Sequence, residues 1–136
     1  MDLKFILDTH ALIWFLEGNR RLGTQAQTVI ADPDSQLVLP VIALAEATLV
    51  IDRGRTTISS SQYFMQRLLA DPRIEIYPLT LEIFVRSQSS KGLLIPELHD
   101  RLIVSTGLYL QDQGNRVQIV TADQSITAAN VLPVVW

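Results

Sequence analysis

Short apolar runs alternate along the whole chain with longer segments in which apolar residues recur every three or four positions. The short runs predict strands, because a strand that is covered on both faces of a sheet is apolar along most of its length. They cover residues 3–7, 36–39, 73–77, 117–121 and 132–136. We therefore expect a sheet built from short, buried strands, of which 117–121 is the clearest.

The longer segments predict helices, and turn and cap residues mark their ends. Pro40 suits the first turn of a helix, and Gly114 ends the longest helical segment. Thr80 and either Ser59 or Ser60 are suitable N-caps. The predicted helices cover residues 9–16, 24–31, 40–52, 59–69, 80–89, 97–113 and 123–129, with an extended link at 93–96. This alternation predicts a three-layer α/β/α fold with a mostly parallel central sheet.

The composition fits one domain over residues 1–136 with a well-buried core. Hydrophobic residues make up 48% of the chain, and the mean hydropathy is positive. No apolar run is long enough to predict a membrane span, and the start of the chain is too short and too acidic for a signal peptide. The absence of cysteine excludes disulfides, thiol catalysis and thiolate metal sites. We therefore expect a cytoplasmic protein without membrane contact.

Four acidic residues stand in or beside apolar runs, where a carboxylate is unfavourable. They are Asp8, Glu46, Asp100 and Asp123. An isolated buried carboxylate costs several kcal/mol, so such a group tends to be protonated, paired or bound to a metal. Few basic residues lie near these acids in the sequence. A divalent cation shared by several carboxylates is therefore the interpretation that we favour.

The predicted fold gives these acids a way to meet, because ligands of open α/β sheets bind beyond the carboxyl ends of the strands. Asp8 and Asp123 each follow a predicted strand. If these two strands are parallel neighbours, about 4.8 Å apart, both carboxylates reach the same crevice. Glu46 and Asp100 can point inward from flanking helices. Glu97 lies three residues before Asp100 on the same helical face and is an auxiliary candidate.

Oxygen ligands without cysteine favour Mg²⁺ or Mn²⁺ over zinc. Such an ion lowers the pKa of a bound water and neutralises phosphate oxygens, which are the requirements of phosphodiester hydrolysis. A zinc site formed by His10 and His99 is an alternative. It is the weaker one, because each histidine is adjacent in sequence to a predicted acidic ligand. A histidine and the acid next to it therefore point in different directions.

Each acid also has an ordinary structural explanation. Asp8 and Asp123 precede predicted helices and can be N-caps. Glu46 can lie on a solvated stripe, and Asp100 can be a first-turn acid favoured by the helix dipole. One shared cause explains all four residues more simply than four separate ones.

The aromatic residues are expected in the core rather than as platforms for base stacking; they are Trp14, Phe15, Tyr63, Phe64 and Tyr109.

The net charge of −3, from 14 acidic and 11 basic residues, argues against a simple polyanion-binding surface. Without the four special acids the chain is close to neutral, so a nucleic-acid substrate is not excluded. The candidates for phosphate contacts are Arg53, Arg55, Lys91, Arg101 and Arg116. Arg101 is the first candidate for substrate binding, because it follows Asp100 directly.

The motifs that carry these acids resemble those of the PIN-domain nucleases. They are the sequence Leu-Asp-Thr-His-Ala-Leu-Ile-Trp at 7–14, Glu46 in its apolar helix, His-Asp-Arg-Leu-Ile at 99–103 and Val-Thr-Ala-Asp at 120–123. Within that family the chain is most similar to the VapC-type toxins of bacterial toxin–antitoxin pairs, and the ending Pro-Val-Val-Trp at 133–136 is similar as well. Each motif is weak alone, but their order and spacing over the chain are specific.

The resemblance implies an endoribonuclease that depends on Mg²⁺ or Mn²⁺ and cleaves single-stranded RNA. The family's acidic quartet matches Asp8, Glu46, Asp100 and Asp123. Asp8 and Asp100 match the most direct metal ligands. Glu46 and Asp123 match the residues that complete the pocket and orient water.

The resemblance also implies supporting residues and partners. Thr121 matches a hydroxyl that supports the site, and Thr9 is expected to act similarly. The family often forms homodimers and is inhibited by a small antitoxin protein whose tail enters the acidic groove. Two departures affect substrate specificity and antitoxin fit: Ala45 stands where many relatives have Trp, and residues 97–100 read Glu-Leu-His-Asp where many have Asp-Pro-Phe-Asp.

Two other functions remain open at this point. A phosphotransfer domain of the haloacid-dehalogenase type would use Asp8 as nucleophile, but it needs a second Asp where this chain has His10. A catalytically silent module would use the same pocket to bind RNA or a protein partner without turnover. Metal-dependent cleavage that Asp8→Asn abolishes would rule out the silent module.

Overall fold

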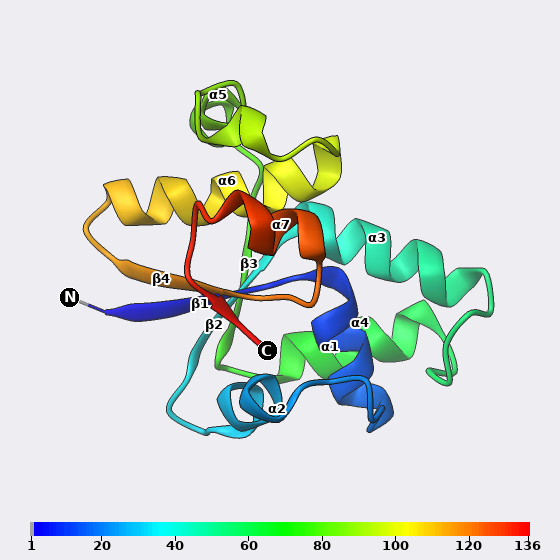
Figure 1. Cartoon of the computed structure of the whole chain (residues 1–136). Helices are drawn as coiled ribbons and strands as arrows, with labels where there is room; N and C mark the ends of the chain where they lie inside the picture. Colours follow the sequence, from blue (N-terminus) through cyan, green and yellow to red (C-terminus); the bar gives the residue numbers. More distant parts are fainter. Residues whose placement is uncertain (1) are drawn as a thin grey trace.

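Five parallel strands form the centre of the protein, in the order β3-β2-β1-β4-β5 (Figure 1). The computed structural model describes residues 2–136. The strands are β1 (Leu3–Leu7), β2 (Gln36–Pro40), β3 (Ile74–Tyr77), β4 (Arg116–Val120) and β5 (Val134–Val135). The predicted α/β class with a mostly parallel sheet is therefore confirmed, and every strand pair is parallel.

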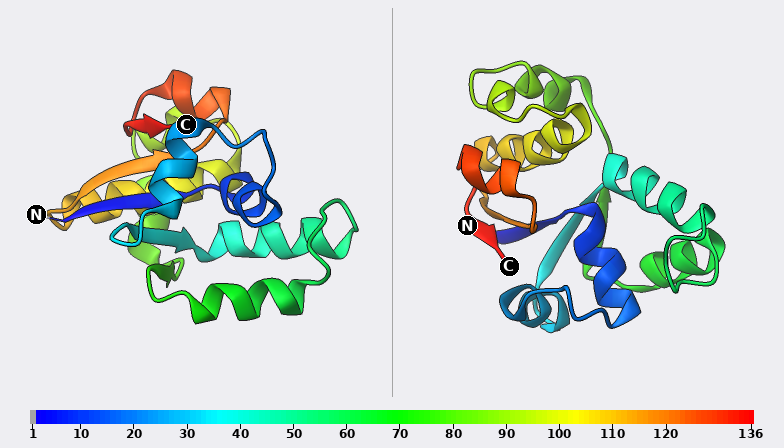
Figure 2. Two further views of the ribbon diagram at one scale, coloured as in Figure 1. Left: turned by 90° about the horizontal axis from the view of Figure 1, so that it is seen from below. Right: turned by 45° about the vertical axis from the view of Figure 1, so that its right-hand side comes forward.

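Helices cover both faces of the sheet. They are α1 (Thr9–Glu17), α2 (Thr24–Ala31), α3 (Val41–Asp52), α4 (Ser61–Ala70), α5 (Leu81–Ser87), α6 (Leu98–Asp112) and α7 (Gln124–Ala129). In Figure 1, α5, α6 and α7 lie above the sheet and α1, α2 and α4 below it, and the right-hand view in Figure 2 shows the same separation. The three predicted layers are present.

One connection differs from its prediction. Residues 93–96 were expected to be extended, but a short 3-10 helix, η1 (Gly92–Leu94), occupies the start of this segment. The backbone N–H of Leu94 donates to the Lys91 carbonyl at 3.2 Å, and the N–H of Ile95 donates to the Gly92 carbonyl at 3.0 Å. These local hydrogen bonds satisfy backbone groups that an extended link would leave to water.

The strand order determines where a site can form. β1 pairs with β2 on one side and with β4 on the other, so the direction of strand succession reverses between β1 and β4. Leu7 is in register with Val120, and the Asp8 N–H donates to the Val120 carbonyl at 3.2 Å. Asp8 and the segment after Val120 therefore leave the sheet side by side, at the position where open α/β sheets bind ligands.

Apolar side chains from both layers bury the sheet. Ile6, Leu39 and Ile103 are fully buried, and Phe64 is too, as predicted. Tyr63 was also expected in the core, but its side chain is 44% exposed, because it lies on the outer face of α4.

Within residues 2–136, no helix combines the length and the apolar character needed to cross a membrane.

Trp136 packs closely against Gly23, the N-cap residue of α2. A Cβ at Gly23 would contact the carbonyl carbon of Trp136 and would lie 2.7 Å from its ring atom Cδ1. The φ angle of Gly23 is −65°, which any residue adopts, so the close approach and not the backbone conformation requires glycine here. The Trp136 ring also packs edge-to-face against Trp14, with ring centroids 5.8 Å apart.

Gly23→Ala is expected to lower the free energy of unfolding by about 1–3 kcal/mol, because the added methyl group overpacks the contact with Trp136. Urea unfolding measures this change, and tryptophan emission reports the displacement of the ring. The same substitution in a chain that ends at Val135 is the control. An equal loss of stability in both backgrounds would contradict the contact as its cause.

Candidate active site

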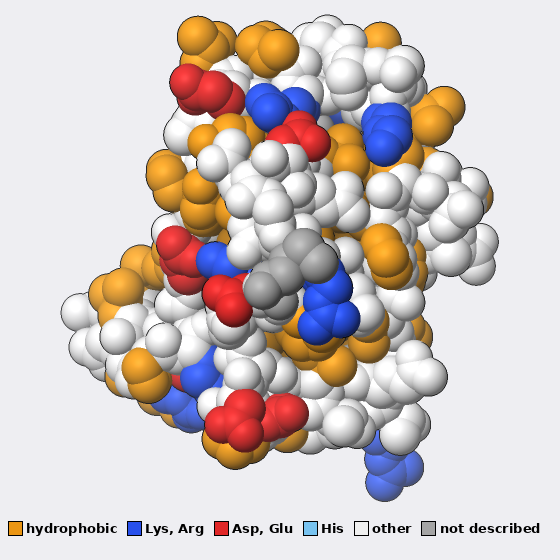
Figure 3. Space-filling model, turned by 90° about the vertical axis from the view of Figure 1, so that its left-hand side faces the viewer, with side chains coloured by type: hydrophobic (Ala, Val, Ile, Leu, Met, Phe, Trp, Pro, Cys, Tyr) orange, Lys and Arg blue, Asp and Glu red, His pale blue; other side chains and the backbone are white. Residues whose placement is uncertain are grey.

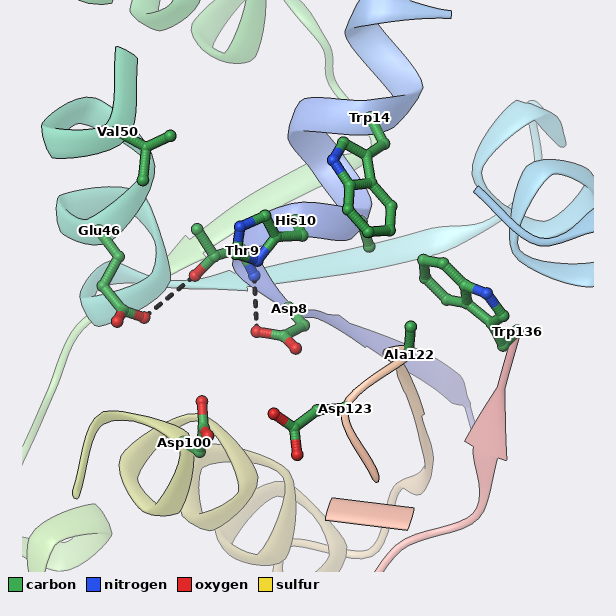
Figure 4. A pocket seen from close by; sticks show the side chains of 11 residues that line it. Asp8, Thr9, His10, Trp14, Glu46, Val50, Asp100, Ala122, Asp123 and Trp136 are labelled. Carbon is green, nitrogen blue, oxygen red and sulfur yellow. Dashed lines mark hydrogen bonds between the residues drawn. The ribbon is translucent and has the colours of Figure 1, made fainter. Parts of the chain in front are cut away.

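The four predicted acids line one cavity of about 350 Å³ at the carboxyl ends of β1 and β4 (Figure 4). Asp8 follows β1, Glu46 comes from α3, Asp100 from the first turn of α6, and Asp123 precedes α7. Figure 4 shows their carboxyl groups facing a shared space from different sides. Residues far apart in the sequence thus form one acidic pocket, as the parallel arrangement predicted.

Asp8 is the most buried member, with 9% of its surface exposed. Its Oδ1 accepts a hydrogen bond from the Thr9 N–H at 2.7 Å, and its Oδ2 accepts one from the Thr121 hydroxyl at 2.6 Å. Burial raises the pKa of this carboxyl above its ordinary value, and the two hydrogen bonds oppose that rise. Asp8 is therefore both the N-cap of α1 and a wall of the pocket, so the two interpretations of this residue are compatible.

Glu46 points from α3 toward the same space, and Thr9 holds it there. The Thr9 hydroxyl donates to Glu46 Oε1 at 3.1 Å, and His99 Nδ1 lies 3.5 Å from Glu46 Oε2. Burial raises the pKa of Glu46, while Thr9 and His99 lower it. This hydrogen bond is the contact by which Thr9 would support the site, and that role stays a prediction.

Thr121 links two of the acids. Its hydroxyl donates to Asp8 Oδ2 and accepts a hydrogen bond from the Asp123 N–H at 3.0 Å. Asp123 Oδ1 in turn accepts from the Ile126 N–H at 3.0 Å and caps α7. One buried hydroxyl therefore sets the relative position of two carboxylates that lie on different segments.

Thr121→Val is expected to lower the free energy of unfolding by about 1–2 kcal/mol, because it leaves Asp8 Oδ2 and the Asp123 N–H without their shared partner. We also expect about tenfold weaker Mn²⁺ binding, since residues that orient metal ligands have effects of that size. Urea unfolding and calorimetric Mn²⁺ titration measure the two effects. Thr28→Val, at an exposed position of α2 where the hydroxyl donates to the Thr24 carbonyl at 3.0 Å, is the matched control; equal losses in both variants would contradict the role of Thr121.

Asp100 differs from the other three acids, because no hydrogen bond reaches its carboxylate from any of residues 2–136. Its pKa is raised to about 7, first by burial and then by the negative charges of Asp8, Asp123, Glu97 and Glu46. The four carboxylates therefore repel one another in the absence of a cation. A divalent cation would relieve this repulsion, and Asp100 is the member most free to move toward one.

Two further predicted residues lie beside the pocket and do not line it. Glu97 is the N-cap of α6 and accepts from the Asp100 N–H at 2.7 Å, so it positions the first turn that carries Asp100. The Arg101 Nε donates to the Ile95 carbonyl at 2.8 Å and thereby holds the segment before α6. The auxiliary role of Glu97 and the substrate contact of Arg101 stay predictions.

The donor set fits a hard divalent cation, since it consists of carboxylate and hydroxyl oxygens. As the side chains stand, no three His, Asp or Glu groups in the described part of the chain are arranged to hold an ion. Hydrogen bonds hold the carboxylates of Asp8, Glu46 and Asp123 where they stand. The alternative zinc site gains no support, because His99 lies against Glu46 and Glu97 whereas the His10 ring packs on Trp14.

Part of the pocket wall is aromatic or apolar, which no sequence pattern predicted. His10, Trp14, Val50 and Trp136 line it (Figure 4). Trp14 was expected to be a core residue; it packs against the core but is only partly buried, and it also lines the pocket. The four-residue spacing of His10 and Trp14 on one helix was the available signal. Nothing in the local sequence indicated Trp136.

Comparisons with known proteins agree with this geometry. The family model of the PIN domain matches residues 5–131. A solved structure described as a toxin–antitoxin complex from Klebsiella pneumoniae is similar to this chain, with a TM-score of 0.69 and 21% sequence identity over 100% of this chain and 97% of the other. A search of curated proteins found no significant match. The family match extends over nearly the whole chain and includes all four acids, so this protein belongs to the PIN-domain family.

Proposed function

We propose that this protein is a metal-dependent endoribonuclease that cleaves single-stranded RNA and acts as the toxin of a type II toxin–antitoxin pair. The observation that carries the proposal is the meeting of Asp8, Glu46, Asp100 and Asp123 in one pocket at the strand-order switch. PIN domains are in general nucleases, and the acidic pocket is the part of this chain that fits phosphodiester hydrolysis.

The four acids have different proposed roles, which follow from their contacts. Asp8 and Asp100 would hold Mg²⁺ or Mn²⁺ directly, and Glu46 and Asp123 would complete the donor set. The bound ion would supply a water of lowered pKa and neutralise phosphate oxygens. Asp8 is already oriented by two hydrogen bonds, whereas Asp100 is free to adjust. Glu46, with its raised pKa, is placed to accept a proton from a water in the pocket.

An antitoxin partner is part of the proposal. The similar solved structure is a toxin–antitoxin complex, and an acidic pocket with an aromatic wall is complementary to a basic peptide segment. A small antitoxin whose tail enters this pocket would block substrate and metal together. A cytoplasmic location follows from the proposed substrate, because cellular RNA is found there.

A homodimer is also proposed, and one surface suits it. Exposed apolar side chains gather on α5, η1 and the start of α6; they are Leu81, Phe84, Val85, Leu93, Leu94 and Leu98. A patch of this kind on a small domain commonly marks an interface between protein chains. Val85→Glu is expected to convert the dimer to a monomer in sedimentation velocity without unfolding it, whereas Glu82→Gln, on the same helix, should leave the dimer intact.

Cleavage of a labelled, mixed-sequence single-stranded RNA tests the enzymatic proposal. We expect cutting with Mg²⁺ or Mn²⁺, none with EDTA, and much slower cutting of the same sequence in a duplex. Expression in a bacterial host should arrest growth, and a co-expressed neighbouring antitoxin gene should restore it. RNA binding without any metal-dependent cutting would instead support the catalytically silent module.

A further inference from the structure

A second cavity, of about 520 Å³, adjoins the acidic pocket and shares His10, Trp14 and Val50 with it. It lies between the C-terminal half of α1 and the loop that joins α3 to α4. The acidic quartet takes no part in lining it. Because the two cavities share Trp14 in their lining, a chain molecule bound at the acids can reach the second cavity.

Glu17 gives this cavity a defined shape. Its Oε2 accepts from the Thr57 N–H at 2.8 Å and from the Thr57 hydroxyl at 3.3 Å. Its Oε1 accepts from the Asn19 side-chain amide at 3.3 Å. Glu17 thereby ties the end of α1 to the loop 40 residues further along. Among the described residues, its carboxylate is the only one lining the cavity, and it already accepts hydrogen bonds from these donors.

The cationic groups of the cavity are free to bind an anion. Arg21 and Arg55 line it and are exposed, and neither forms an ion pair within residues 2–136. Two arginines elsewhere in the chain differ: Arg73 pairs with Asp71, and Arg86 pairs with Asp112. Among the described residues, two arginines without acidic partners lie beside the Thr56 hydroxyl, and together they form a donor set that suits a phosphate group.

Planar groups stand between the two cavities. The Arg21 guanidinium carbon lies 5.1 Å from the centroid of the Trp14 ring, and the His10 ring lies 5.5 Å from it. Unpaired bases stack on aromatic rings and on arginine planes of this kind. A paired base has both faces covered by its neighbours in the duplex, so this arrangement suits a single strand.

We propose that the second cavity binds the nucleotide that flanks the scissile phosphodiester. Arg55 binds its phosphate, and the base stacks on the Trp14–Arg21 pair. The inference rests on the proposed ribonuclease function and names the residues by which that site would hold single-stranded RNA. A protein partner is the competing occupant. The nucleotide is favoured because the cavity combines guanidinium groups without an ion pair among the described residues, the Thr56 hydroxyl and planar surfaces in one place.

The two tryptophans of the chain, Trp14 and Trp136, both line the acidic pocket, so intrinsic fluorescence reports binding there. A mixed-sequence 2′-O-methyl RNA hexamer, titrated into Asp8→Asn with Ca²⁺, is expected to quench this fluorescence. Anisotropy of a labelled hexamer then gives its affinity. Loss of the stacking surface in Trp14→Leu is expected to weaken binding by about 5- to 100-fold.

Arg55→Gln tests the phosphate contact. We expect at least about fivefold weaker binding and a salt dependence whose log–log slope falls by about 0.7, the value for one phosphate contact on a single strand. In the active protein the same substitution should raise KM and leave kcat nearly unchanged. Arg116→Gln is the matched control, at the amino end of β4. Figure 3 shows the face beside the amino ends of β1 and β4, where basic and acidic side chains are interspersed.

The outcomes separate this inference from the function on which it rests. Weaker hexamer binding in Arg55→Gln and Trp14→Leu, with Arg116→Gln unchanged, supports the subsite even if the wild type fails to cleave RNA. If Arg55→Gln and Trp14→Leu both bind the hexamer as tightly as Arg116→Gln, the subsite is overturned even if the wild type cleaves. Unchanged fluorescence with the hexamer, but quenching by a purified antitoxin peptide, also overturns it and identifies a protein occupant.

Discussion

Asp8→Asn is expected to reduce metal-dependent RNA cleavage by about a thousandfold or more and to leave the fold intact. A loss of that size corresponds to about 4 kcal/mol of transition-state stabilisation, which is the range expected when a direct metal ligand loses its charge. The fold should survive, because asparagine keeps the shape of the side chain and an oxygen that can accept from the Thr9 N–H. Single-turnover cleavage with Mn²⁺ measures the effect, and circular dichroism checks the fold.

Asp34→Asn is the matched control for this result. Asp34 is an exposed residue of the loop before β2 and lies outside the acidic pocket. We expect its cleavage rate to equal that of the wild type. If Asp8→Asn retained activity within tenfold of the control, the assignment of Asp8 as a metal ligand would be wrong.

Asp100→Asn is expected to stabilise the metal-free protein at pH 8 and to lose that advantage as the pH falls. The folded pKa of Asp100 is about 7, above the value of about 3.9 for an unfolded chain, so the folded state binds more protons between these values. Stability of the wild type therefore decreases as the pH rises from about 4 to 7. Asparagine carries no charge, so the variant does not lose stability in this way. Below the unfolded pKa the wild-type carboxyl is protonated in both states, and the difference in stability between wild type and variant disappears.

Thermal unfolding at pH 5 and pH 8 measures this difference. We expect the variant to melt about 3–6 °C above the wild type at pH 8 and by a smaller margin at pH 5; the margin is discounted because Asp100 is half-buried and solvent screens its charge. Mn²⁺ should raise the melting temperature of the wild type but hardly that of the variant. An equal response to Mn²⁺ in both proteins would contradict the assignment of Asp100 as a ligand.

Much of the fold follows from local sequence patterns. The strand at Leu3–Leu7 and the helix at Thr24–Ala31 have the predicted boundaries, and Ser60, Thr80 and Asp123 occupy N-cap positions. Apolar periodicity and caps determine these elements, because both act within one or two turns of the chain. The 3-10 turn at Gly92–Leu94 was missed, since it depends on backbone hydrogen bonds that no side-chain pattern announces.

The acidic half of the site was also accessible from the sequence. Asp8 and Asp123 follow buried parallel strands, and the register of Leu7 with Val120 brings their segments together. A carboxylate in an apolar setting is costly, so its presence signals a function or a partner. The same argument applies to Glu46 within the apolar helix α3.

Contacts between distant segments of the folded chain set how these acids are held and what faces them. The Thr121 hydroxyl contacts both Asp8, which lies 113 residues earlier in the chain, and the Asp123 N–H. Gly23 has no side chain and so leaves room for Trp136 at the pocket wall. Glu17 fixes the loop at Thr57 that completes the second cavity. Such contacts join segments that are far apart in the chain, so local periodicity carries no information about them. The sequence alone therefore determined the sheet, its helices and the acidic residues at its edge, whereas long-range packing determined the aromatic wall, the cationic subsite and the raised pKa of Asp100.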